Sequence, residues 1–119
     1  MKSHTQVAVI GGGVVGCSVL YHLTKLGCKD VILLERSELT SGSTWHAAGG
    51  MHTINGDPNV AKLQQYTIEL YQEIEEISGQ DIGLHMSGGI MLAATQERFD
   101  WLKSMHAKGA YLGMDTEII

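Results

Sequence analysis

Three glycines with the spacing Gly11-x-Gly13-x-x-Gly16 follow a short apolar run, and an acid, Glu35, stands further along the chain. Such glycines allow a tight turn, a close approach of backbone to a diphosphate, and close packing of a helix on a strand. A helix that begins at the turn offers N–H groups and partial positive charge to phosphate. A carboxylate after the next strand accepts hydrogen bonds from ribose hydroxyls, which disfavours NADP. The pattern predicts a dinucleotide site and does not distinguish FAD from NAD. The alternative interpretation is a glycine turn with a purely structural role.

A second group of reactive side chains lies in the segment SGSTWHAAGG, residues 41–50. Trp45 and His46 stand there between two glycine-rich stretches, and nothing in a plain packing pattern calls for them. A neutral imidazole is a competent nucleophile near pH 7. Trp45 is interpreted as an aromatic core residue in preference to a direct substrate contact.

The elements that must position these residues are a strand, a glycine turn, a helix and a second strand. Val7–Ile10 is a continuous apolar run, which suits a strand buried on both faces of a parallel sheet. From Val14 the apolar residues recur at helical spacing, and Gly27 stands where a helix often ends. Residues 30–35, DVILLE, read as the second strand. This order predicts a βαβ unit of a Rossmann-like fold, and hence an α/β protein.

The rest of the chain alternates irregular stretches and regular elements. Asp57 and Pro58 predict the start of a long helix that ends at Gly79. Residues 82–95, IGLHMSGGIMLAAT, read as a β-hairpin. Thr95 is expected to cap a further helix that ends at Gly109 or Gly113, and residues 116–119, TEII, read as the start of a strand.

Composition narrows the function classes. The 119 residues carry a formal charge of −5 with scattered Lys and Arg, so nucleic acid and anionic membranes are not expected as partners. The first strand begins close to Met1, so no targeting peptide is expected, and the cytoplasm is the expected location. Cys17 and Cys28 lie at opposite ends of the first expected helix, roughly 16 Å apart, beyond disulfide reach. The histidines and cysteines show no metal-ligand spacing.

The stretch VIGGGVVGCSVLYHLTKLGCKDVILLERSELTSGSTWHAAGG, residues 9–50, resembles the flavin-dependent amine oxidoreductases of the D-amino-acid oxidase superfamily. Within that superfamily it is most similar to the dimethylglycine and sarcosine dehydrogenase branch. The later segment GQDIGLHMSGGIMLAAT, residues 79–95, also looks like the corresponding family segment. The most specific part is Gly42 to Gly49, and Gly50 departs from relatives, which more often have an apolar residue there.

The resemblance implies that the cofactor is FAD. In the branch it resembles, the histidine of this segment bonds to the 8α-methyl carbon of the flavin, which places that link at His46. The alternative is a noncovalent contact of His46 with the isoalloxazine ring. Ser43 and Thr44 are then expected to donate hydrogen bonds to phosphate. The motif's Glu35-Arg36 pair and Gly42 complete the expected cofactor-binding set.

The resemblance also implies a domain organisation and a substrate. Residues 1–119 correspond to the N-terminal part of a FAD-binding domain, with 80–119 beginning the substrate-domain insertion, so the chain is expected to be a fragment of a larger enzyme. The implied parent oxidises the CH–NH group of a small N-methyl amine such as dimethylglycine or sarcosine. The alternatives are a non-catalytic fragment or partner subunit that binds only an ADP-containing dinucleotide and, more weakly, an NAD-dependent dehydrogenase. The isolated chain is expected to be inactive and to self-associate.

Overall fold

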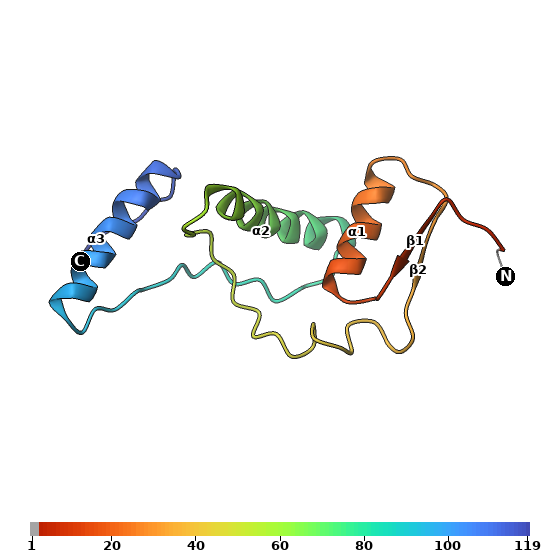
Figure 1. The fold of residues 1–119 in the computed structure, drawn as a ribbon, viewed down its shortest axis with the longest axis horizontal. Helices are drawn as coiled ribbons and strands as arrows, with labels where there is room; N and C mark the ends of the chain where they lie inside the picture. Colours follow the sequence, from red (N-terminus) through yellow and green to blue (C-terminus); the bar gives the residue numbers. More distant parts are fainter. Residues whose placement is uncertain (1–2) are drawn as a thin grey trace. The chain divides into compact units, whose positions relative to one another are not determined.

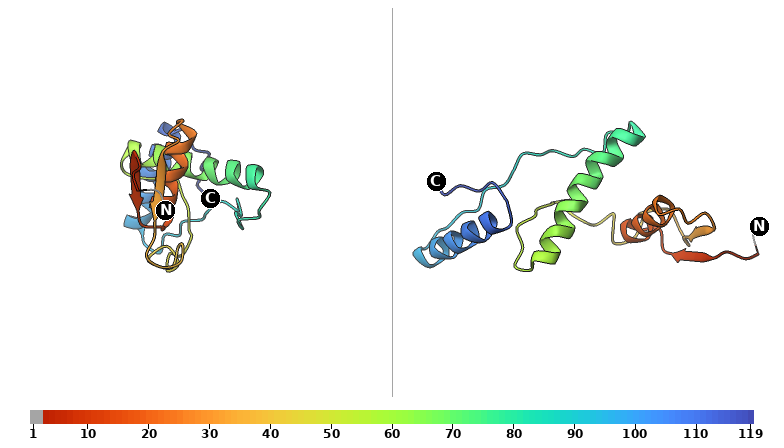
Figure 2. Two further views of the ribbon diagram at one scale, coloured as in Figure 1. Left: turned by 90° about the vertical axis from the view of Figure 1, so that its right-hand side faces the viewer. Right: turned by 90° about the horizontal axis from the view of Figure 1, so that it is seen from above.

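The computed structural model describes residues 3–119, and the chain divides into two compact units, Met1–Gly49 and Gly50–Ile119. The first unit contains the strand β1 (Val7–Ile10), the helix α1 (Val14–Lys25) and the strand β2 (Val31–Leu34). The two strands pair in parallel, and α1 packs against both of them (Figures 1 and 2). The predicted βαβ unit is confirmed.

The ends of these elements follow from local hydrogen bonds. At the start of β1 the Thr5 hydroxyl donates to the Asp30 carbonyl at 3.0 Å, and the Asp30 carboxylate accepts from Gln6 N–H at 3.0 Å. These bonds set the parallel register in which Val7 lies opposite Val31. After α1, Gly27 has a φ of +91°, a conformation that favours glycine. The predicted helix end is therefore confirmed.

The strands are less buried than the apolar run predicts. Val9 is buried, whereas Ile10 is 85% exposed. The strands contact only each other and α1 among the described elements. Since one helix covers a single face of a two-stranded sheet, the expectation of strands buried on both faces is wrong for this structure.

The second unit contains two helices, α2 (Pro58–Ser78) and α3 (Gln96–Tyr111). The Asp57 carboxylate caps α2 by accepting from Asn59 N–H at 2.7 Å and from Val60 N–H at 3.1 Å. Gly79 ends the helix with a φ of +66°. Both predicted ends of α2 are confirmed. Proline in the first turn of a helix and a left-handed glycine after its last turn are each favourable.

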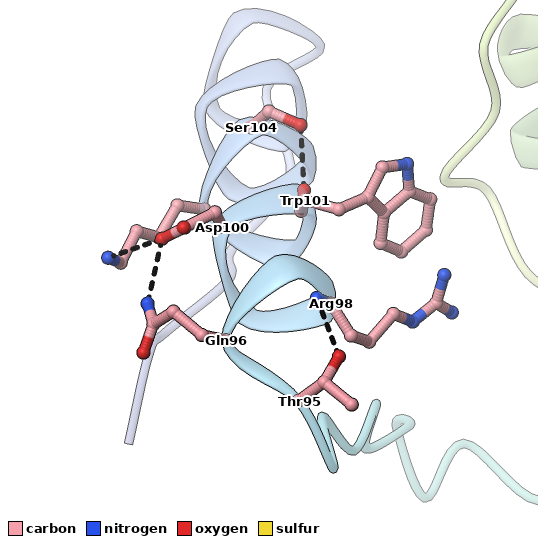
Figure 3. Close-up of polar contacts among 7 residues, drawn as sticks. Thr95, Gln96, Arg98, Asp100, Trp101 and Ser104 are labelled. Atoms are coloured by element: carbon pink, nitrogen blue, oxygen red, sulfur yellow. Dashed lines mark hydrogen bonds and ion pairs between the residues drawn. The ribbon is translucent and has the colours of Figure 1, made fainter.

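The helix α3 begins at the predicted cap and displays paired polar side chains. The Thr95 hydroxyl accepts from Arg98 N–H at 3.2 Å, and the Arg98 guanidinium lies 3.9 Å from the centre of the Trp101 ring (Figure 3). The helix continues through Gly109, and Gly113, with a φ of +76°, follows its end. Of the two predicted ends, the one near Gly113 is therefore correct.

The predicted β-hairpin is absent, since residues 79–95 contain no strand (Figure 2). Ile90 and Leu92 are 79% and 84% exposed, and Asp81 accepts from Gly83 N–H at 2.7 Å within a local turn. An isolated hairpin is marginal in water, and no described strand pairs with this segment. Residues 116–119 are likewise not a strand. The expected division at residue 80 stays a prediction.

Two hydrogen bonds connect distant segments of the second unit. Lys108 Nζ donates to the Gly56 carbonyl at 2.6 Å, and the Thr53 hydroxyl donates to Met114 Sδ at 3.4 Å. Both join the segment before α2 to the end of α3. Among residues 3–119, neither α2 nor another helix is long and apolar enough to cross a lipid bilayer.

Candidate functional site: a glycine turn and the loop that closes over it

The glycine turn between β1 and α1 needs glycine at two positions for different reasons. Gly11 has a φ of +103°, and its N–H donates to the Leu34 carbonyl at 2.8 Å. A Cβ at position 16 would lie 1.8 Å from the Gly11 carbonyl oxygen, which no side chain can accommodate. Gly13 is the N-cap residue of α1 and contributes no side-chain cap. The turn therefore brings the backbone of β1 directly against the first turn of α1.

Glu35 is bound to this turn by its carboxylate. One oxygen accepts from Gly12 N–H at 2.6 Å and the other from Ser37 N–H at 2.9 Å. These two backbone hydrogen bonds hold the pKa of Glu35 below its usual value, and the bond from Gly12 has the larger effect. The nearby charge of Arg36 acts in the same direction. Each carboxylate oxygen has a second lone-pair site, so Glu35 keeps acceptor capacity for a ligand hydroxyl.

Residues 39–46 form a run of turns that closes over the glycine turn. Thr40 N–H donates to the Gly12 carbonyl at 2.9 Å, and the Thr40 carbonyl accepts from Trp45 N–H at 3.0 Å. Thr40 has a φ of +64°, an uncommon conformation for a β-branched residue. A Cβ at Gly12 would lie 2.5 Å from Leu39 Cδ2, so the loop rests on a position that glycine leaves open.

Thr44 connects this loop to the start of α1. Its hydroxyl oxygen accepts from Val14 N–H at 3.0 Å, and a Cβ at Gly13 would lie 3.0 Å from the same oxygen. The first-turn N–H groups of a helix have no acceptor within the helix. Thr44 supplies an acceptor for one of these groups, the N–H of Val14. The sequence prediction placed Thr44 beside a phosphate at this helix end, and the structure brings it to that end.

His46 is exposed, and its ring is oriented by the loop itself. Its Nδ1 lies 3.0 Å from the Gly42 carbonyl oxygen. A carbonyl only accepts, so in the neutral ring this contact places the proton on Nδ1 and the lone pair on Nε2. Trp45 is 77% exposed, so its interpretation as a core residue is wrong here. The turns at residues 39–46 present both rings at the surface of the first unit.

The structure brings together most of the predicted cofactor-binding residues. Gly11, Gly13, Gly16, Glu35 and Thr44 meet around the N-terminus of α1, and His46 follows Thr44 by two residues. The remaining predicted residues, Gly42, Ser43 and Arg36, are exposed.

Sequence reasoning missed Gly12 and Thr40, whose backbones link the turn to the loop. The run of three glycines at 11–13 was the one available signal for Gly12. A left-handed threonine leaves no signal in the sequence.

Other reactive groups form no second site within the described part of the chain. His106 Nδ1 lies 2.8 Å from the Thr116 hydroxyl, and Cys17 and Cys28 are free thiols. Across residues 3–119 no group of three His, Cys, Asp or Glu side chains is arranged to hold a metal ion.

Comparison with known proteins gives the family. The model of the DAO family, described as FAD dependent oxidoreductase, matches residues 6–119. Dimethylglycine dehydrogenase, mitochondrial, from Homo sapiens is 46% identical over 117 residues, which cover 93% of this chain and 14% of that protein. Sarcosine dehydrogenase, mitochondrial, from Homo sapiens is 38% identical over 120 residues, which cover all of this chain and 13% of that protein.

A third relative is named as a regulatory subunit and not as a dehydrogenase. The pyruvate dehydrogenase phosphatase regulatory subunit, mitochondrial, from Mus musculus is 37% identical over 119 residues, which cover all of this chain and 14% of that protein. The chain therefore spans a small part of the length of each of these relatives. The family match decides between the two dinucleotides that the glycine pattern left open, and it favours FAD over NAD.

Proposed function

The chain belongs to the DAO family of FAD-dependent oxidoreductases, and from this premise we propose that it is the FAD-binding part of an enzyme that oxidises N-methyl amino acids of the dimethylglycine or sarcosine type. Relatives with those names support the substrate class. The structural observation that carries the proposal is the hydrogen bond between Val14 N–H and the Thr44 hydroxyl, two residues from His46. This hydrogen bond joins the N-terminus of α1, the proposed phosphate site, to the loop that carries His46, the proposed nucleophile.

The residues fit an FAD molecule at its ADP end. The N–H groups at the start of α1 and the side-chain-free Gly13 suit a diphosphate. Glu35 accepts hydrogen bonds from ribose hydroxyls, while Ser43 and Thr44 donate to phosphate oxygens. Arg36 and Gly42 flank these groups and complete the proposed binding set. When bound, FAD supplies a two-electron acceptor for the amine substrate.

His46 is the proposed attachment point, through Nε2. The hydrogen bond between Nδ1 and the Gly42 carbonyl supports this choice, because it leaves the Nε2 lone pair available. Forming a bond from Nε2 to the 8α-methyl carbon would break one methyl C–H bond and the imidazole N–H bond. The two protons would pass to water, and the two electrons would pass to the electron acceptor of turnover, either oxygen or an electron-transfer protein. The alternative is a noncovalent contact of the same ring.

The reaction proposed for the longer protein is the loss of a hydride equivalent from the N-methyl or neighbouring carbon of the amine. The amine becomes an iminium ion, and water converts the iminium to a shorter amine and an aldehyde. We propose that residues 80–119 begin the substrate domain. That domain would position the amine. The cytoplasmic location stays a prediction, and the two dehydrogenase relatives are mitochondrial proteins by name.

A second candidate function is a non-catalytic partner subunit that binds an ADP-containing dinucleotide. The relative named as a regulatory subunit favours it, since it matches the whole of this chain at 37% identity. Both candidate functions use the same dinucleotide-binding residues, and they differ in whether the bound flavin oxidises an amine. Reduction of bound flavin by the amine therefore separates them.

The test is made on the longer protein that contains this chain. We expect it to be yellow, to be bleached by sarcosine or dimethylglycine without oxygen, and to keep flavin on the protein after acid precipitation. His46→Ala should release the flavin to the supernatant. Flavin that is bound but never reduced by either amine would support the partner subunit, and flavin released from the wild type would support the noncovalent contact. A colourless protein would contradict the proposed cofactor role.

A further inference from the structure

The helix α1 is capped by a residue from a distant part of the chain. A helix usually takes its cap from the residue just before it, but that residue here is Gly13, which has no side chain. The hydroxyl of Thr44, 30 residues after Val14, accepts from the Val14 N–H instead. This cap therefore ties the loop of residues 39–46 to the helix, which an ordinary cap would not do.

A second hydrogen bond fixes the other end of the same loop. Thr40 N–H donates to the Gly12 carbonyl at 2.9 Å, so the loop is bound to the turn at Gly12 and to the helix at Val14. Thr40 reaches this position with a left-handed backbone, which is unfavourable for a β-branched residue. Two attachments four residues apart leave the intervening chain little freedom to shift.

The orientation of His46 depends on this loop. The Thr40 carbonyl accepts from Trp45 N–H at 3.0 Å, and the Gly42 carbonyl lies 3.0 Å from His46 Nδ1. Both carbonyls lie in the segment that begins at Thr40 and is bound again at Thr44. A displacement of the segment from α1 would therefore move the His46 ring relative to the helix end.

We infer that Thr44 is a positioning residue that fixes His46 relative to the phosphate-binding end of α1. The inference rests on the proposed function, and it assigns to the Thr44 hydroxyl a role besides phosphate binding. The oxygen accepts from Val14 N–H, and its own hydrogen is left to donate to a phosphate oxygen. One hydroxyl then joins helix, loop and cofactor, and His46 is held in place before the cofactor arrives.

The first experiment needs no cofactor. Hydrogen–deuterium exchange by mass spectrometry is measured on the 119-residue chain for wild type, Thr44→Val, Thr44→Ser and the control Thr24→Val. Thr24 also carries a hydroxyl that bonds to backbone, the Tyr21 carbonyl, but within α1. Losing one hydrogen bond corresponds to about a fivefold change in an opening equilibrium.

We expect Thr44→Val to speed exchange about fivefold both at the start of α1 and in residues 39–47. Thr44→Ser, which keeps the hydroxyl, should match the wild type, and Thr24→Val should leave the loop unchanged. Faster exchange in α1 alone, or no change in either segment, would overturn the inference. The exchange result holds whether or not the longer protein binds FAD.

The second experiment measures attachment of flavin to the longer protein at saturating FAD, where weaker phosphate binding no longer limits the rate. Thr44→Val should slow covalent incorporation about fivefold or more, and Thr44→Ser should restore it. Wild-type incorporation by Thr44→Val at saturating FAD would overturn the inference. A wild type that holds no FAD would instead contradict the proposed function, and the exchange experiment alone would then decide the role of Thr44.

Discussion

The Glu35 carboxylate lies 2.6 Å from the Gly12 backbone nitrogen, and its second oxygen lies 2.9 Å from that of Ser37. The residue expected to recognise ribose thus also holds the glycine turn in place. A carboxylate that accepts two backbone N–H groups is stabilised in its charged form. Its ionisation is therefore linked to the folding of the first unit.

Acid is expected to remove the stability that Glu35 contributes. The hydrogen bonds from Gly12 and Ser37 lower its folded-state pKa, so the contribution is fully present above the unfolded pKa, about 4.3, and is lost as pH falls through the lower folded value. We expect Glu35→Gln to be less stable than wild type at pH 7, with the difference closing below about pH 4.3. Urea unfolding at several pH values checks this, and a difference that stays constant down to acid pH would contradict it.

Gly16→Ala is expected to destabilise the first unit. The new Cβ would lie 1.8 Å from the Gly11 carbonyl, a backbone atom that cannot rotate away. Forced contacts of this kind cost about 1–3 kcal/mol or more. Chemical unfolding measures the loss, and Gly50→Ala is the control because a Cβ there meets nothing within 4 Å. Equal stability of the two variants would show that α1 shifts readily on β1.

The 119-residue chain by itself is expected to show no amine dehydrogenase activity. A complete dinucleotide fold has two halves, and the described strands form one parallel pair. The chain also spans 13% to 14% of the length of the relatives compared above. A dye-reduction assay with sarcosine and dimethylglycine at added FAD tests this, and steady turnover above a heat-denatured sample would refute it.

The isolated chain is also expected to self-associate. Ile10, Leu92 and Tyr111 are 85%, 84% and 83% exposed, and among the described strands β1 pairs only with β2. Exposed apolar side chains and unpaired strand edges favour association between copies. Light scattering or sedimentation at micromolar concentration should show dimers or larger species. A dispersed monomer over that range would mean that these surfaces are tolerated in water.

Much of the fold could be predicted because its signals are local. A glycine turn after an apolar run, Asp57 before Pro58, and Thr95 three residues before Arg98 each act within a few residues through hydrogen bonds to the nearest backbone. The hairpin at residues 82–95 failed for the opposite reason. A strand is stable only with a partner, and local alternation of residue types cannot supply one.

The sequence by itself determined which groups are available here: the glycines of the turn at Gly11–Gly16, the carboxylate of Glu35, and an imidazole in the Trp45-His46 pair. Only the tertiary structure decided how these groups are connected. Val14 and Thr44 are 30 residues apart, and their hydrogen bond exists because β2 returns the chain parallel to β1 and its loop crosses the start of α1. The left-handed Thr40 and the contact of the His46 ring with the Gly42 carbonyl belong to that closed loop. Each hydrogen bond here pairs a side chain with a backbone group that nearly every residue carries, so residue types alone do not specify which groups will meet.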